Sequence, residues 1–302
     1  MKIEYIPHNS IDLVKWDECI THALNGIVYA YSWYLNIVAE EWDALVGDNY
    51  SVVFPLIKGR KNGISYLYQP FFTQQLGLFS PNRIDSETIK ALVDMIPRKY
   101  QYQIINFNTF NCLENIKGEI IEKVTYQLDL VQPYFNLSSN YSENTRRNVS
   151  KSLANGVTIN RMLSVADYIL FKSANLVVPL KDDQLDRLSK IMLFAHEKGI
   201  GEIYAAFSAQ RELCAAAFFI RSNGKVIYLS AASNELGKSN RAMFLLIDQF
   251  INDYSESHLI LDFEGSSIEN IARFYAGFGA SRCTYQQLRV NKLPWFLKPF
   301  IK

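Results

Sequence analysis

The chain has 302 residues, of which 49% are hydrophobic and 14% aromatic, enough apolar surface for two packed domains of ordinary size. Its formal net charge is +1, so no overall field directs the protein onto DNA or an anionic membrane. Any site for a polyanion has to be a local patch.

The cysteines and histidines are dispersed, which argues against a metal site. Cys19, Cys112, Cys214 and Cys283 form no C-x-x-C pair, and we expect them to be buried thiols in a reducing compartment. The amino terminus has no apolar signal core, and no apolar run is long enough to span a bilayer. We therefore expect a cytoplasmic protein without a metal.

The first half of the chain predicts alternating strands and helices. Period-two and period-3.6 patterns of apolar residues, bounded by turn residues, define these elements. We expect strands at 2–6, 42–47, 50–57, 64–70, 103–110 and 125–130, and helices at 13–23, 32–40 and 86–95.

The second half predicts the same order of elements more clearly. Three strands follow one another as a meander, because short turns separate them. We expect strands at 157–162, 202–208, 212–220, 225–232, from 259, and at 284–290, and helices at 165–175, 182–198, 241–254 and from 268.

The repeated order predicts two copies of one fold. Both copies end in a Thr-Tyr-Gln strand, at 125–127 and 284–286. We predict an α/β (α+β) protein with domains at 1–131 and 132–302, joined near 131–136. Each domain is expected to be a mixed, mostly antiparallel twisted sheet flanked by helices.

The segment 258–280 is the most informative part of the chain. Alternation along its strand points Leu259, Leu261 and Phe263 to one side and Ile260, Asp262 and Glu264 to the other. Two carboxylates would then share a face at the strand's end. In the following helix, Ser266 and Glu269 can form a capping box, and Gly279 is expected to end the helix as a left-handed cap.

This strand and helix resemble the last conserved block of the GNAT acyltransferase superfamily. The matching residues are Ala272, Phe274, Tyr275 and Gly279-Ala280. The order of elements in the second half is also that of a GNAT domain, so the resemblance implies a GNAT-like fold and an acyl-transfer activity.

Tandem GNAT-like domains are what the FemABX family looks like. That family includes the peptidyltransferases that build peptidoglycan cross-bridges from aminoacyl-tRNA. The segment 140–159 is similar to the one that opens the family's second domain, although Asn144 departs from its frequent basic residue. The residues that fit are Arg146, Arg147, Asn148, Val149, Lys151, Ser152, Gly156 and Val157.

The resemblance places a donor-binding loop at 234–243. In GNAT enzymes the corresponding backbone N–H groups bind pyrophosphate at a helix N-terminus. The loop here has one glycine and lacks paired glycines, which argues against classical acetyl-CoA binding; a simply well-capped helix is the alternative. The candidate donor-binding residues are Gly237, Lys238, Ser239, Asn240 and Arg241.

Three residues are candidates for catalysis. Tyr275 matches the position from which several GNAT enzymes offer a phenol as general acid, and a core tyrosine is the alternative. Glu264 and Asp262 could act as general base for an attacking amine, or could cap the next helix.

Two further groups are candidates for the acceptor. Arg146, Arg147 and Lys151 suit a phosphate, with Arg161 on the next strand, but a solvated helix face explains them equally. Gln69 and Gln74, with Gln75, lie in the aromatic segment 66–80 and could line the cleft between the domains or belong to an interdomain packing strand. The tail 293–302 could touch a membrane surface or dock back onto the first domain.

The residues and the resemblance together predict an acyltransferase that moves an acyl or aminoacyl group to an amine. No bound cofactor is expected, and acyl-CoA or aminoacyl-tRNA would be the co-substrate. The acceptor would be a small molecule or a cell-wall (peptidoglycan) precursor, with contact to the acceptor end of tRNA, none to DNA, and at most peripheral membrane contact. The alternative is a catalytically inactive ligand-binding or scaffold protein of the same fold.

Overall fold

The computed structural model describes residues 1–176, 179–265 and 268–295. They form two compact units. The first unit contains Met1–Lys123 and the residues from Thr284 on, and the second contains Val124–Cys283. The predicted ranges, 1–131 and 132–302, differ from these units mainly because each assigns the last strand of its half to its own domain.

The first unit is a mixed sheet with the strand order β1-β2-β3-β4-β5-β12. Neighbouring strands are antiparallel except β4 and β5, which are parallel. The strands are β1 (Ile3–Ile6), β2 (Glu41–Gly47), β3 (Val52–Lys61), β4 (Ile64–Leu67), β5 (Tyr102–Asn106) and β12 (Ser281–Asn291), and the helices are α1 (Leu13–His22), α2 (Ser32–Val38) and α3 (Ser86–Asp94).

The second unit repeats this order as β7-β8-β9-β10-β11-β6. Again one neighbouring pair, β10 and β11, is parallel and the others are antiparallel. The strands are β6 (Glu119–Asp129), β7 (Thr158–Asn160), β8 (Gly201–Phe207), β9 (Leu213–Ser222), β10 (Lys225–Ser233) and β11 (Ile260–Asp262). The helices are α4 (Tyr134–Ser139), α5 (Glu143–Ala154), α6 (Val165–Ala174), α7 (Asp182–Glu197), α8 (Glu235–Ser239), α9 (Ala242–Tyr254) and α10 (Glu269–Ala276).

The last strand of each half pairs with the other half's sheet. In β6, Gln127 lies opposite Asp262 of β11, and in β12, Gln287 lies opposite Asn106 of β5. Both halves end in a similar Thr-Tyr-Gln strand, so the local sequence pattern does not show whether each strand joins the sheet of its own half or that of the other half. Only the strand pairing in the folded chain distinguishes these two arrangements.

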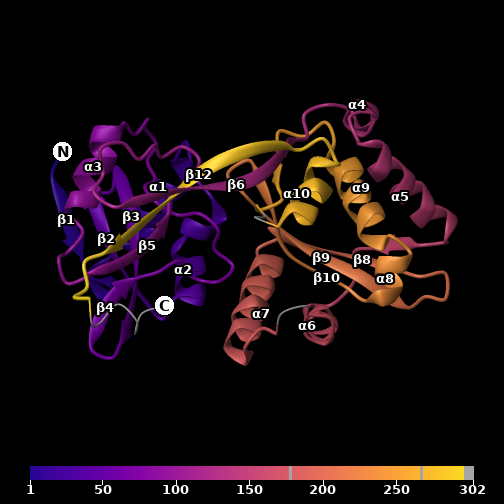
Figure 1. The fold of residues 1–302 in the computed structure, drawn as a ribbon, viewed down its shortest axis with the longest axis horizontal. Helices are drawn as coiled ribbons and strands as arrows, with labels where there is room; N and C mark the ends of the chain where they lie inside the picture. Colours follow the sequence, from indigo (N-terminus) through magenta and orange to yellow (C-terminus); the bar gives the residue numbers. More distant parts are fainter. Residues whose placement is uncertain (177–178, 266–267, 296–302) are drawn as a thin grey trace. The chain divides into compact units, whose positions relative to one another are not determined.

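The helices of the second unit cover both faces of its sheet. In Figure 1, α9 and α10 lie on one face and α6 and α7 on the other. Leu261 and Phe263 are fully buried against the α9 side, so the predicted alternation holds for these apolar residues. The mixed, mostly antiparallel α/β fold is therefore confirmed.

The segment after β11 differs from the prediction at two points. The strand ends at Asp262, and Glu264 adopts a left-handed backbone with φ 52°, so the two carboxylates do not continue one alternating face. Helix α10 ends at Ala276 with Gly277 as its C-cap, whereas Gly279 lies beyond it at φ 81°. Ser266 of the expected capping box lies outside the described residues. In the part of the chain that the structure describes, no helix has the length and apolar character needed to cross a membrane.

Candidate active site in the second unit

The sheet of the second unit parts where β11 ends. β11 runs beside β10 only from the pair Lys225–Ile260 to the pair Ile227–Asp262, while β10 continues to Ser233. The register of β10 against β9 also shifts between Tyr228 and Ser230. A β-bulge of this kind leaves a residue outside the ladder and is frequent beside active sites. The end of β10 therefore has an edge that β11 does not cover.

Tyr275 of α10 lies beside this opening in a group of aromatic rings. Its ring stacks on Phe263 at 4.9 Å between centroids and meets Tyr228 edge-on at 6.1 Å. Burial and the neighbouring Glu264 raise the pKa of Tyr275 above its usual range. Among the described residues its hydroxyl has no hydrogen-bond partner, so this phenol stays protonated and its O–H is available to a ligand.

Glu264 is placed by the turn that follows β11. Its backbone N–H donates to Asp262 Oδ1 at 3.0 Å, and its own carboxylate is close enough to influence the phenol of Tyr275. A non-glycine residue in the left-handed region costs about 1–3 kcal/mol and is concentrated at functional sites. The structure thus brings two of the predicted catalytic residues together.

Asp262 does not lie in the same environment. It is 1% exposed and accepts hydrogen bonds from the Thr125 hydroxyl, from Gln127 Nε2 at 2.8 Å and from the N–H of Glu264. Burial raises the pKa of Asp262, opposed by the Thr125 and Gln127 hydrogen bonds and the charge of Lys225. All three donors come from the protein, so the geometry favours a structural carboxylate over the predicted general base.

Lys172 is a residue that the sequence did not single out. It lies on α6, is 8% exposed, and donates from Nζ to the carbonyl of Ala231 on β10 at 2.9 Å. Desolvation lowers the pKa of Lys172 to about 8. In the sequence, Lys172 occupies an ordinary polar position of a helix, in the segment FKSAN. The one indication of its burial is its separation of four residues from Tyr168, which places both residues on one face of the helix.

Replacing Lys172 by methionine should change how stability depends on pH. Because its pKa is about 8 in the folded protein and 10.5 is the ordinary value, the unfolded chain binds more protons between these two pH values. The wild-type protein should therefore gain stability with rising pH relative to Lys172→Met, by about 3 kcal/mol across the window. Urea unfolding of both proteins at pH 7–11 measures this difference. The exposed Lys198→Met is the control, and parallel curves for wild type and Lys172→Met would contradict the assignment.

The candidate donor loop consists of α8 and the start of α9. Gly237 is buried, and a Cβ there would lie 2.0 Å from the carbonyl oxygen of Cys214. Packing alone therefore explains why this residue is a glycine. Lys238 pairs with Glu235 at 2.6 Å, and the Ser239 hydroxyl donates to a carbonyl of its own helix. Of the two cations in this loop, Arg241 is therefore the one whose side chain has no ion pair or hydrogen bond among the described residues.

Arg241 and Asn240 connect this loop to the basic helix α5. Arg241 has a left-handed backbone, φ 58°, at the N-cap of α9 and is exposed. Asn240 Oδ1 accepts from Asn155 Nδ2, at the end of α5, at 3.2 Å. The end of α5 and the positive end of the α9 dipole are therefore neighbours, although Asn155 and Asn240 are 85 residues apart in the sequence.

The predicted basic cluster on α5 is divided by the structure. Arg146 donates to the carbonyls of Ser139 and Tyr141, the latter at 2.6 Å, and so caps the end of α4. Arg147 is exposed, and its Nη1 lies 4.0 Å from Glu143 Oε1. An exposed ion pair of this kind contributes little to stability. Lys151 is exposed and has no partner within the described residues. Arg147 and Lys151 thus remain candidates for phosphate.

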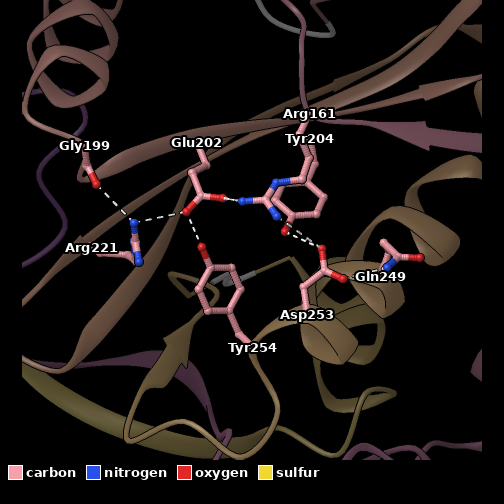
Figure 2. A network of polar contacts seen from close by, with 8 residues as sticks. All are labelled: Arg161, Gly199, Glu202, Tyr204, Arg221, Gln249, Asp253 and Tyr254. Atoms are coloured by element: carbon pink, nitrogen blue, oxygen red, sulfur yellow. Dashed lines mark hydrogen bonds and ion pairs between the residues drawn. The ribbon is translucent and has the colours of Figure 1, made fainter.

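Arg161 belongs to a separate network, shown in Figure 2. It pairs with Glu202 and lies 3.8 Å from Asp253, with its guanidinium over the Tyr204 ring. Glu202 also binds Arg221 at 3.2 Å and accepts from the Tyr254 hydroxyl. These mutually compensated charges tie β7, β8, β9 and α9 together, so Arg161 has a structural role.

Gln69 and Gln74 lie in the first unit and are held by it. Gln69 donates to the carbonyl of Thr73 at 2.7 Å and accepts from the N–H of Asn106 at 3.1 Å. Gln74 accepts from the amide of Gln75 at 2.7 Å. These contacts fasten the 66–80 segment to β5 within the first unit. Of the tail, Trp295 is 82% exposed, and residues 296–302 lie outside the described part.

Comparisons with known proteins agree with this fold. No model of a known protein family matches the sequence, and no curated protein matches it. The structure is similar to FemX, with a TM-score of 0.67 at 12% identity over 100% of both chains. It is also similar to a protein of unknown function from Bacteroides thetaiotaomicron, with a TM-score of 0.61 at 11% identity over 95% of this chain and 100% of that one.

A third similar structure is the C-terminal domain of a putative lysylphosphatidylglycerol synthetase from Agrobacterium fabrum. Its TM-score is 0.53 at 8% identity, over 94% of this chain and 92% of that domain. The chain therefore has a fold like that of FemX. At these identities the likeness establishes the fold and not the substrate.

Proposed function

We propose that this protein is a cytoplasmic acyltransferase of the GNAT/FemABX type that transfers an acyl or aminoacyl group to an amine. The observation that carries the proposal is the phenol of Tyr275. It is protonated, without a partner among the described residues, and placed beside Glu264 where the sheet parts. Positioning plus one proton donor and one acceptor is what amide formation from an activated ester requires.

The proposed reaction moves two protons in opposite directions. The amine attacks the ester or thioester carbonyl, forming the C–N bond, and gives a proton to the Glu264 carboxylate. Collapse of the tetrahedral intermediate breaks the C–O or C–S bond, and Tyr275 protonates the departing oxygen or sulfur. Proton exchange with solvent then restores both side chains.

We further propose that the donor is an aminoacyl-tRNA acceptor end or an acyl-CoA. Arg241, Lys151 and the α9 N-terminus would meet its phosphates, since the hydrogen bond between Asn155 and Asn240 makes α5 and this helix start neighbours. The acceptor would be a small amine or a peptidoglycan precursor. An inactive scaffold is the second candidate, because packing alone explains Gly237, the loop's one glycine.

The test is incubation of the full chain with a charged tRNA or an acyl-CoA and an amine-bearing precursor, followed by mass spectrometry of the acceptor. We expect a mass gain equal to the acyl group, in an amide that survives mild alkali that hydrolyses esters. The Tyr275→Phe variant is the matched control. If stoichiometric enzyme yields no acylated amine from either donor while binding one of them, the scaffold candidate replaces the transferase.

A further inference from the structure

A small cavity in the first unit gathers three cations from distant parts of the chain. It has a volume of about 280 Å³ and lies between the end of α3, the start of β5 and the end of β12. Its charged lining includes Arg98, Lys117 and Lys292.

The backbone holds these three residues around the cavity. Lys292 follows β12, and its N–H donates to the carbonyl of Gln101 at 2.8 Å, next to the turn that carries Arg98. Lys117 precedes Gly118, which has φ 150° and packs so closely on β12 that a Cβ would lie 3.0 Å from the carbonyl oxygen of Arg289. Gly118 therefore lets the Lys117 segment lie directly on β12.

The charges of this cavity are not balanced by the protein. Within the described residues, Arg98, Lys117 and Lys292 have no ion pair or side-chain hydrogen bond. The acid in the lining, Asp94, already pairs with Lys90. The whole chain has 31 basic and 30 acidic residues, so three uncompensated cations at one cavity are a local excess. Like charges repel, and a bound anion would relieve that repulsion.

We propose that this cavity binds a phosphate or diphosphate group. Arginine's planar fork binds two phosphate oxygens at once, and two lysines add point charges. Three positive charges match a group with two or more negative charges, whereas a single carboxylate would leave two cations unmatched. The side-chain amide of Gln101, which has no hydrogen-bond partner among the described residues, adds a donor. The site belongs to the first unit and is independent of the chemistry proposed at Tyr275.

The proposal is tested by calorimetry with inorganic pyrophosphate at about 50 mM salt. We expect Arg98→Gln to weaken binding about tenfold or more, because the substitution removes a charge-assisted hydrogen bond to the anion. The triple variant Arg98→Gln, Lys117→Gln, Lys292→Gln should abolish binding. The matched control is Arg60→Gln, Lys61→Gln, Lys123→Gln, which removes the same charge elsewhere and should bind as the wild type does.

Vesicles distinguish the source of the phosphate. Flotation with phosphatidylglycerol vesicles, with phosphatidylcholine vesicles as reference, shows whether a lipid headgroup occupies the site; pyrophosphate binding without flotation indicates a soluble ligand. Pyrophosphate binding or flotation each supports the site if the Arg98, Lys117 and Lys292 triple variant loses that binding and the control triple variant keeps it. The inference is overturned if neither probe binds, or if both triple variants, with unchanged circular dichroism, lose binding equally.

Discussion

Tyr275→Phe is expected to lower kcat for acyl transfer by about 10² to 10⁴, with little change in KM. The substitution removes the proposed proton donor and breaks no other contact of the hydroxyl, because the Tyr275 hydroxyl has no hydrogen-bond partner among the described residues. The ring would still stack on Phe263 at 4.9 Å. Steady-state kinetics with the donor identified by mass spectrometry measure the effect.

The stability of this variant separates catalysis from folding. A core tyrosine with a satisfied hydroxyl would lose about 1 kcal/mol on conversion to phenylalanine, whereas Tyr275→Phe should unfold at the same urea concentration as the wild type. Tyr102→Phe, the same deletion in β5 of the first unit, is the matched control. Unchanged turnover in Tyr275→Phe would remove the phenol from the mechanism.

Glu264→Gln completes this test on the acceptor side. Glutamine keeps the shape and the backbone N–H that donates to Asp262, but cannot take a proton from the amine. If Glu264 is the base, activity falls while the thermal transition stays in place. Retained activity would assign Glu264 to holding the turn alone.

Asp262→Ala is expected to have the largest effect on stability, a loss of about 3–5 kcal/mol. The side chain is 1% exposed, and its removal leaves the Thr125 hydroxyl, the Gln127 amide and the Glu264 N–H without their acceptor. Each buried unsatisfied donor costs about 1–3 kcal/mol. Urea unfolding monitored by circular dichroism measures the loss.

Asp262→Asn distinguishes a structural carboxylate from a catalytic one. Its amide oxygen can still accept from Thr125 and Glu264, and the Gln127 amide can turn to present its oxygen. We therefore expect a loss of about 1 kcal/mol or less and retained transferase activity. A stable but inactive Asp262→Asn protein would restore Asp262 as the general base.

Much of the fold follows from local pattern. The meander of β8, β9 and β10 lies where alternation and turn residues predicted it, because strand periodicity and turn chemistry are short-range properties. The burial of Leu261 and Phe263 was also predictable, because alternation along a strand is a local property. The closeness of Tyr275 to Glu264 depends on how α10 packs, since Tyr275 lies near the end of that helix farther along the chain from β11.

Long-range contacts decided the rest. Arg146 and Arg147 are adjacent and look alike in the sequence, yet one caps α4 and the other faces solvent. Lys172 looks like a surface lysine but is buried by β10. The partners of Arg146 lie only five and seven residues before it, but they belong to the end of another helix, whose packing the periodicity of α5 does not describe. The partner of Lys172 lies 59 residues along the chain.

The sequence by itself determined the order of elements, the apolar faces and the fold class, since each depends on residues a few positions apart. The tertiary structure alone decided that β6 and β12 each join the opposite half, and that Asp262 is enclosed by three donors. It also brought Arg98, Lys117 and Lys292 around one cavity. These outcomes depend on which distant segments pair and on which charges find partners, and that is settled only when the chain has folded.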